Sequence, residues 1–126
     1  MTEETLNKIL ERHAHYIAQD VEDWESYRAI FDGLDLSGIN LSFKNLSYAS
    51  FQNVDFSNAN LNVAVFKHCD FFGAKFFNTG LDNTHFYDCN FSFASFRMSN
   101  LTNIWIERSI FKHMRFENCK MDRALF

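Results

Sequence analysis

A large apolar residue recurs at every fifth position over most of the chain. The series runs from Phe31 to Phe126, and all twenty of its positions hold Phe, Leu, Ile or Met. A period of five fits neither an α-helix, which repeats about every 3.6 residues, nor a strand, in which side chains alternate. The chain must therefore turn at each repeat, with the large side chain pointing inward.

A second periodic position lies two residues before each large residue, and it is usually small. Fourteen of its twenty members are Ala, Cys, Ser or Thr, and the residue between the two positions is often Asp or Asn. Lys44 departs from this pattern, and a charge buried without a partner is costly. Either its stem packs inward while its amine reaches solvent, or the ammonium pairs with an acid of the N-terminal segment.

The five-residue repeats are themselves arranged in groups of four, which gives a period of twenty. One of the four resulting series is entirely aromatic and consists of Phe31, Phe51, Phe71, Phe91 and Phe111. Another is aliphatic and consists of Leu41, Leu61, Leu81, Leu101 and Met121. Four repeats per coil place residues twenty apart on neighbouring rungs, about 4.8 Å from one another. We therefore predict a buried core that includes Phe51, Phe71, Phe91, Phe111, Leu61, Leu81 and Leu101.

These residues resemble the pentapeptide repeat proteins, whose consensus is A(D/N)LXX. The stretches FSNANLNVAVF and GLDLSGINLSFKNLSYASF are close to that pattern as they stand. The resemblance covers about residues 29–126. It implies an all-β solenoid, a right-handed quadrilateral parallel β-helix of about five coils with 20 residues per coil. We assign residues 29–126 to this β-helix and residues 1–28 to an N-terminal α-helical cap.

The expected cap has the pattern of an amphipathic helix over residues 3–18. Apolar side chains recur there at helical spacing, and Thr2 stands where an N-cap residue would. The segment ILERHAHYI resembles an "IL..H..WL" leader that precedes many bacterial and phage pentapeptide repeats, with Tyr16 in place of the Trp. At the other end Phe126 is itself a repeat centre. The last coil would then leave an open strand edge, which sheet proteins normally cover, so we expect it to pair with another molecule.

Composition and charge narrow the class of protein. The net charge is −4 over 126 residues, which is too mild to indicate nucleic acid or an acidic membrane as a direct partner. No apolar run approaches the roughly 18 residues of a membrane span, and the first residues are acidic where a signal peptide would be basic. We expect a soluble protein of the cytoplasm.

The charge is unevenly distributed along the chain. Residues 31–126 carry nine acids and nine bases, so the net −4 lies in residues 1–30, which have seven acids and three bases. Within the repeats, residues 31–88 have six acids and three bases (−3), and residues 89–126 have three acids and six bases (+3). The predicted rod is neutral overall and has a mild dipole.

Candidate chemistry is sparse. Cys69, Cys89 and Cys119 fall on the small inward position, where Cys acts as a compact hydrophobe, and we expect them to be reduced. His68, Asp88 and Arg108, each twenty apart below Tyr48, form an outward column that we interpret as surface pairing, because no nucleophile stands beside it. No His, Cys or Asp set has metal-ligand spacing. We predict no catalytic residue, no metal, no cofactor and no enzyme activity.

Outward apolar residues are the better candidates for function, because exposed aromatic clusters often mark interfaces. One predicted column contains Trp105 and Leu125 and runs into the C-terminal end, and Ile110 and Phe126 lie nearby. A second group is expected at one corner of the middle coils and consists of Phe72, Phe77, Phe93 and Met98. The alternative for this second group is that its side chains only cover the backbone between coils.

Two functions from different classes follow. The first is a non-catalytic scaffold that binds an unidentified protein, as a homodimer through its C-terminal coil. The second rests on the resemblance: some pentapeptide repeat proteins are dimeric rods that mimic B-DNA in size and negative charge and bind DNA gyrase. This chain would then be a decoy for a DNA-binding protein such as a type II topoisomerase or a phage-defence factor. The neutral rod favours the first.

Overall fold

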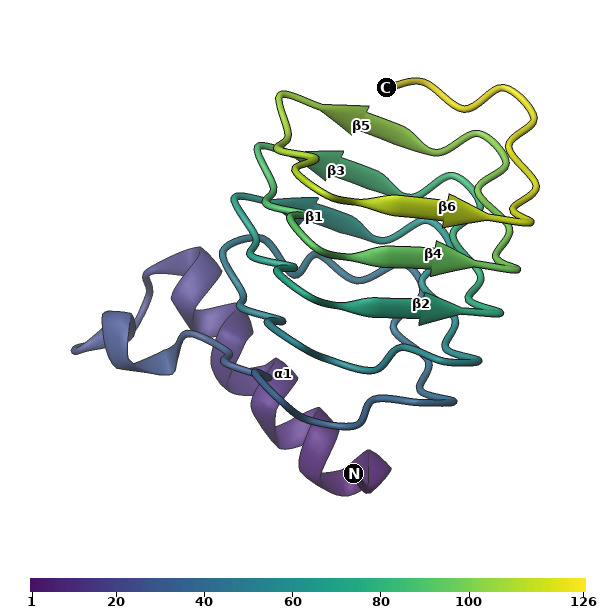
Figure 1. Cartoon of the computed structure of the whole chain (residues 1–126). Helices are drawn as coiled ribbons and strands as arrows, with labels where there is room; N and C mark the ends of the chain where they lie inside the picture. The colour runs from purple at the N-terminus through teal and green to yellow at the C-terminus, as the bar shows by residue number, and fades with distance from the viewer.

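The computed structural model describes residues 1–126 as a rectangular coil with a helix at its N-terminal end (Figure 1). Helix α1 (Glu3–Ala18) and the short 3-10 helix η1 (Trp24–Tyr27) precede the coil. The strands are β1 (Val65–Lys67), β2 (Lys75–Phe77), β3 (His85–Tyr87), β4 (Ser95–Arg97), β5 (Trp105–Glu107) and β6 (Arg115–Glu117). They form two parallel sheets, ordered β1-β3-β5 and β2-β4-β6.

The twenty-residue period is confirmed by the pairing of the strands. Phe66 pairs with Phe86, and Phe86 pairs with Ile106. Isolated bridges on the other two faces join residues in the same way, from Ile30 with Ser50 to Asn100 with Lys120. The chain therefore advances by one rung for every four repeats, as the sequence predicts.

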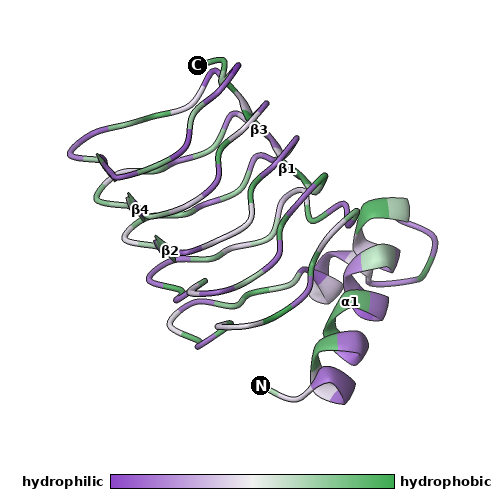
Figure 2. Cartoon of the chain, turned by 90° about the vertical axis from the view of Figure 1, so that its right-hand side faces the viewer, coloured by the Kyte–Doolittle hydropathy of each residue, from purple (hydrophilic) through white to green (hydrophobic).

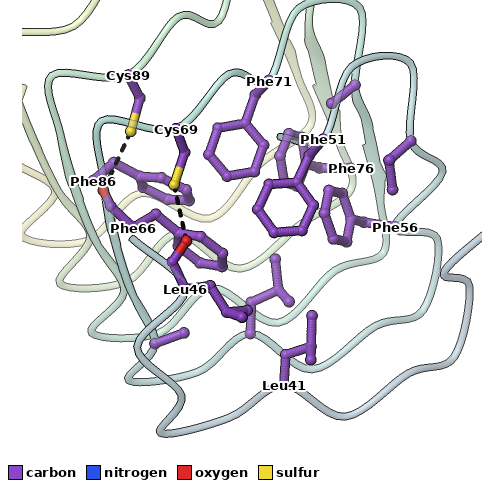
Figure 3. Packing of buried hydrophobic residues seen from close by; sticks show 14 of the residues in the cluster. Leu41, Leu46, Phe51, Phe56, Phe66, Cys69, Phe71, Phe76, Phe86 and Cys89 are labelled. Atoms are coloured by element: carbon purple, nitrogen blue, oxygen red, sulfur yellow. Dashed lines mark hydrogen bonds between the residues drawn. The ribbon is translucent and has the colours of Figure 1, made fainter. Parts of the chain in front are cut away.

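The core is a set of aromatic and aliphatic stacks that run along the rod. Phe51 and Phe71 lie with ring centroids 5.0 Å apart and planes 5° from parallel (Figure 3). Phe71 and Phe91 repeat this geometry at 5.2 Å. All three rings are fully buried, as are Leu61, Leu81 and Leu101. Identical side chains on successive rungs stack because the parallel pairing holds them in register.

The Asp or Asn that often precedes the large residue stabilises the local turn. Its side-chain oxygen accepts the backbone N–H two residues further on, as when Asp35 Oδ1 accepts from Ser37 N–H at 2.9 Å and Asn60 Oδ1 from Asn62 N–H at 3.0 Å. Hydrogen bonding from the Ser37 side chain, and then from its backbone N–H, lowers the pKa of Asp35, because it favours the charged carboxylate. Each bond fixes a corner of the coil in the manner of an Asx turn.

Polar side chains at the small inward position donate hydrogen bonds to backbone carbonyls of the coil below. Thr79 Oγ1 donates to the Phe56 carbonyl at 2.8 Å, and Cys69 and Cys89 Sγ donate to the Leu46 and Phe66 carbonyls, each at 3.2 Å (Figure 3). All three cysteines are free thiols. Burial raises the pKa of the Cys69 thiol well above its usual value. These thiols are structural parts of the core.

Helix α1 covers part of the first coil, at the opposite end of the rod from the C-terminus (Figure 2). Thr2 caps it by accepting the Thr5 N–H at 3.1 Å. His13 is 1% exposed and hydrogen-bonds the backbone of the first coil. Its Nδ1 accepts the Ala29 N–H and its Nε2 donates to the Ser47 carbonyl, each at 2.9 Å. Burial lowers the pKa of His13, because it penalises the charged imidazolium.

Lys44 lies next to this cap and is exposed. None of the ion pairs in the molecule includes it. Of the two arrangements that the sequence allowed, the ammonium therefore reaches solvent, and a buried pair with an N-terminal acid is wrong.

Candidate interaction surfaces

The last coil exposes side chains that are buried everywhere else in the rod. Phe111 is 37% exposed, whereas Phe91, directly below it, is fully buried. The prediction that Phe111 belongs to the buried core is therefore wrong, because no rung covers the upper side of its ring. Phe116 and Phe126 are 38% and 58% exposed. A hollow of about 310 Å³ is lined by Phe111, Met114, Phe116 and Phe126.

Backbone groups on the outer edge of the last coil also lack partners. One coil lower, the N–H groups of Phe91 and Leu101 donate to carbonyls of the next rung at 2.8 Å and 2.7 Å. The equivalent groups of Phe111 and Met121 make no backbone hydrogen bond. A row of free donors beside an apolar hollow is the arrangement to which another strand adds.

The Trp105 column forms as the sequence predicts. Leu125 forms a bridge with Trp105, and the His85 ring stacks on the indole at 4.6 Å between centroids. His85 Nε2 also lies 3.3 Å from Glu107 Oε2. Trp105 and Leu125 are 47% and 61% exposed, and Ile110 on the neighbouring face is 58% exposed. This apolar column is continuous with the open last coil.

The predicted corner cluster divides into two parts, on either side of the β2-β4-β6 face. Phe72 and Phe93 contact each other, with ring centroids 5.4 Å apart. Phe77 instead lies under the Arg97 guanidinium, 5.5 Å from the ring centroid. Met98 follows β4 and is 52% exposed. No ring contact joins Phe77 to the other pair, so the four residues do not form one patch.

Sequence reasoning missed the most exposed large hydrophobic side chain. Phe43 is 76% exposed, and a groove of about 520 Å³ separates it from α1, where Leu10 and Ile17 contribute apolar lining. Phe43 has a φ of 63°, in the left-handed region that Asn and Gly occupy at half of the other corners. A bulky residue at such a corner is the signal that would have found it.

The polar column carries no catalytic arrangement among its contacts. His68 Nδ1 lies 2.7 Å from Asp88 Oδ2, and the Tyr48 ring stacks on His68 at 5.0 Å. Arg108 does not continue the column: it donates to the Tyr87 hydroxyl at 3.0 Å and makes no ion pair with Asp88. None of these contacts brings a Ser, Thr or Cys side chain to the His68–Asp88 pair.

Two further kinds of feature are absent from the structure. No group of three or more His, Cys, Asp and Glu side chains is placed to hold a metal ion. No helix has the length and apolar character needed to cross a membrane.

The sequence matches the family model of pentapeptide repeats, with eight copies over residues 45–76 and 69–104. No curated protein matches it. Many solved structures are similar, and three of them follow. Rfr23, a pentapeptide repeat protein from the cyanobacterium Cyanothece 51142, is 17% identical, with 82% of this chain and 98% of that chain covered and a TM-score of 0.46. A pentapeptide repeat protein from the Arabidopsis thaliana thylakoid lumen is 29% identical, with 66% and 61% covered and a TM-score of 0.39.

The third is a trypsin-treated variant of QnrB1, a plasmid-mediated fluoroquinolone resistance protein. It is 24% identical, with 70% of this chain and 53% of that chain covered and a TM-score of 0.50. The chain thus spans about half of the QnrB1 structure, and the likeness concerns the fold alone. The repeat match and the twenty-residue rungs show that the chain belongs to the pentapeptide repeat proteins, and its fold is the right-handed quadrilateral β-helix.

Proposed function

We propose that this protein is a non-catalytic protein-binding scaffold that forms a homodimer through its last coil. One observation carries the proposal: the last coil combines unpaired backbone N–H groups with the exposed rings of Phe111, Phe116 and Phe126. Covering these groups removes apolar area from water, which favours association by about 25 cal/mol per Å². A second copy offers the same apolar surface, and the carbonyls of its Ser109 and Met114, which accept no backbone hydrogen bond, can serve as acceptors for these donors, as a two-fold interface requires.

The Trp105 column extends this interface along one side of the rod. Trp105 and Leu125 are both exposed and lie on adjoining rungs. Tryptophan is among the residues that contribute most to binding at interface centres. Two copies that meet at the last coil would therefore also bury the upper part of this column, and the remaining sides of each rod would stay free for a partner protein.

The experiment is a measurement of solution mass by light scattering. We expect twice the mass of one chain for the wild type and the mass of one chain for Leu125→Asp, because a buried charge at the interface is costly. Ile30→Asp is the matched control: Ile30 is 51% exposed but lies at the other end of the rod, and this variant should remain dimeric. A monomeric wild type would overturn the homodimer.

The charge of the rod distinguishes this proposal from the DNA-mimic alternative. A decoy presents acidic rows, whereas residues 31–126 carry nine acids and nine bases. The resistance function named for QnrB1 belongs to that protein, and competition with DNA for a type II topoisomerase tests whether this chain shares it. Competition that weakens steeply as salt rises would support the decoy, whereas a scaffold with an apolar interface should not compete.

A further inference from the structure

A stack of exposed rings marks one corner of the three uppermost coils. The rings of Phe72 and Phe93 contact at 5.4 Å between centroids, and the His113 ring stacks on Phe93 at 4.9 Å. Phe72 and Phe93 are 38% and 54% exposed. Neighbouring rungs supply one ring each, so the stack runs along the edge of the rod.

Basic side chains line the same corner and have no ionic partner. Lys75 and Arg115 belong to one column of the β2-β4-β6 face, separated by Ser95. Lys112 directly precedes His113 in the last coil. All three bases are exposed, and none makes an ion pair. We name this surface the basic aromatic corner, which comprises Phe72, Lys75, Phe93, Lys112, His113 and Arg115.

The carboxylates near the basic aromatic corner lie at its lower end or at the far edge of the face. Asp55 forms a β-bridge with Lys75 from one rung below, and Asp70 accepts the Phe72 backbone N–H at 2.9 Å. Glu117 lies 3.8 Å from Arg97, at the far edge of the face. Lys112 and Arg115, at the upper end, have no carboxylate within ion-pair distance, so they leave a local excess of positive charge beside exposed aromatic rings.

The corner also contains a hollow in which a side chain fits. A space of about 460 Å³ lies between the two uppermost coils, bounded by Phe93, Ser95, His113, Met114 and Arg115. Its lining includes two residues with rings, Phe93 and His113, and two polar residues, Ser95 and Arg115. Arginine and aromatic residues are the types enriched at the centres of protein interfaces.

We propose that the basic aromatic corner is a docking surface for an acidic peptide segment of a partner protein. An Asp- or Glu-rich segment supplies the charges that Lys75, Lys112 and Arg115 lack, and an apolar side chain of that segment enters the hollow beside Phe93. The surface lies on the side of the rod, so it goes beyond the end-to-end homodimer and does not depend on it.

A nucleic acid is the other polyanion to consider, and the charge of the whole chain disfavours it. Domains that bind nucleic acid are usually strongly basic, whereas this chain has a net charge of −4. The seven acids of residues 1–30 repel a long polyanion, but a short peptide engages the three bases without approaching them. The His113 ring also stacks on Phe93, which leaves fewer ring faces for bases.

The test is an NMR titration of the isotope-labelled full chain with a synthetic peptide of alternating Glu, Asp and Phe. We expect saturable shifts at the backbone amides around Phe93, His113 and Arg115, and affinity that falls as salt rises. Arg115→Glu should weaken binding at least about tenfold, and Phe93→Ala should also weaken it. The amide spectrum of each variant reports whether it is folded.

Arg123→Glu is the matched control, because it makes the same charge change in the same coil at another corner and should bind as the wild type does. Equal loss in both charge-reversal variants would reduce the effect to net charge and overturn the proposal. Shifts with oligothymidylate but not with the peptide would assign the corner to nucleic acid instead, and no shifts up to about 1 mM peptide would rule out the site. Binding by Leu125→Asp separates this surface from the homodimer.

Discussion

The two ends of the rod differ in whether the backbone groups at their edges find hydrogen-bond partners. At the N-terminal end, α1 lies against the first coil, and His13 hydrogen-bonds two of its backbone groups, the Ala29 N–H and the Ser47 carbonyl. At the C-terminal end, the N–H groups of Phe111 and Met121 have no backbone partner. The backbone of a solenoid is the same at both ends, so what differs is the side chains that cover it. This difference is why we propose that the protein associates through its last coil.

The largest expected effect compares two phenylalanines of one stack. Phe91→Ala should lower the free energy of unfolding by about 3–5 kcal/mol, because it leaves a cavity in a closed core. Phe111→Ala should cost less than half as much, since Phe111 is already 37% exposed. Urea unfolding monitored by circular dichroism measures both, at protein concentrations low enough to keep the chain monomeric. Equal losses of unfolding free energy in the two variants would mean that the Phe111 ring of the monomer is packed as closely as the Phe91 ring.

The next effect removes the N-terminal closure. His13→Ala leaves a buried N–H at Ala29 and a buried carbonyl at Ser47 without partners, which should cost about 2–4 kcal/mol in unfolding free energy. His15→Ala is the control, because His15 is exposed and its ring contacts Asp20 and Tyr27 and not the backbone of the first coil. If His13→Ala unfolds at the same urea concentration as the wild type, the cap does not close the coil.

The smallest effect is a dependence of stability on pH. Burial lowers the pKa of folded His13 below the 6.5 of a free imidazole, so the unfolded chain binds the proton more tightly. The stability from neutral His13 is complete above pH 6.5 and is lost as the pH falls through this value toward the folded pKa, at up to about 1.4 kcal/mol per pH unit. The difference between wild type and His13→Gln in urea unfolding from pH 7.5 to 5 should shrink accordingly. A constant difference would contradict it.

The periodic part of the structure could be predicted from the sequence almost completely. The stack of Phe51, Phe71 and Phe91 follows from a period of twenty, because periodicity determines which side of the chain each residue faces. The same reasoning failed at Phe111. Periodicity says that the ring faces inward but not whether another rung covers it, and that depends on what lies beyond the last coil.

The candidate surfaces were harder to predict because they depend on side-chain choices at the corners. Arg108 was expected to pair with Asp88 on the neighbouring rung but donates to the Tyr87 hydroxyl. A long side chain such as Arg reaches more than one neighbour. Phe43 was missed because its corner was interpreted only as a turn. The unpaired state of Lys112 and Arg115 could not be predicted, because it depends on where the nearby carboxylates form their own contacts.

The pairing of residues twenty apart has a consequence for how such a chain can change in length. Every core residue of the middle coils finds its partners one rung above and one rung below, so an added or deleted coil leaves the remaining contacts intact. A change of five residues would instead rotate everything after it by a quarter turn and bring unlike faces together. Lineages of this protein should therefore lengthen or shorten in whole coils, with both end surfaces retained.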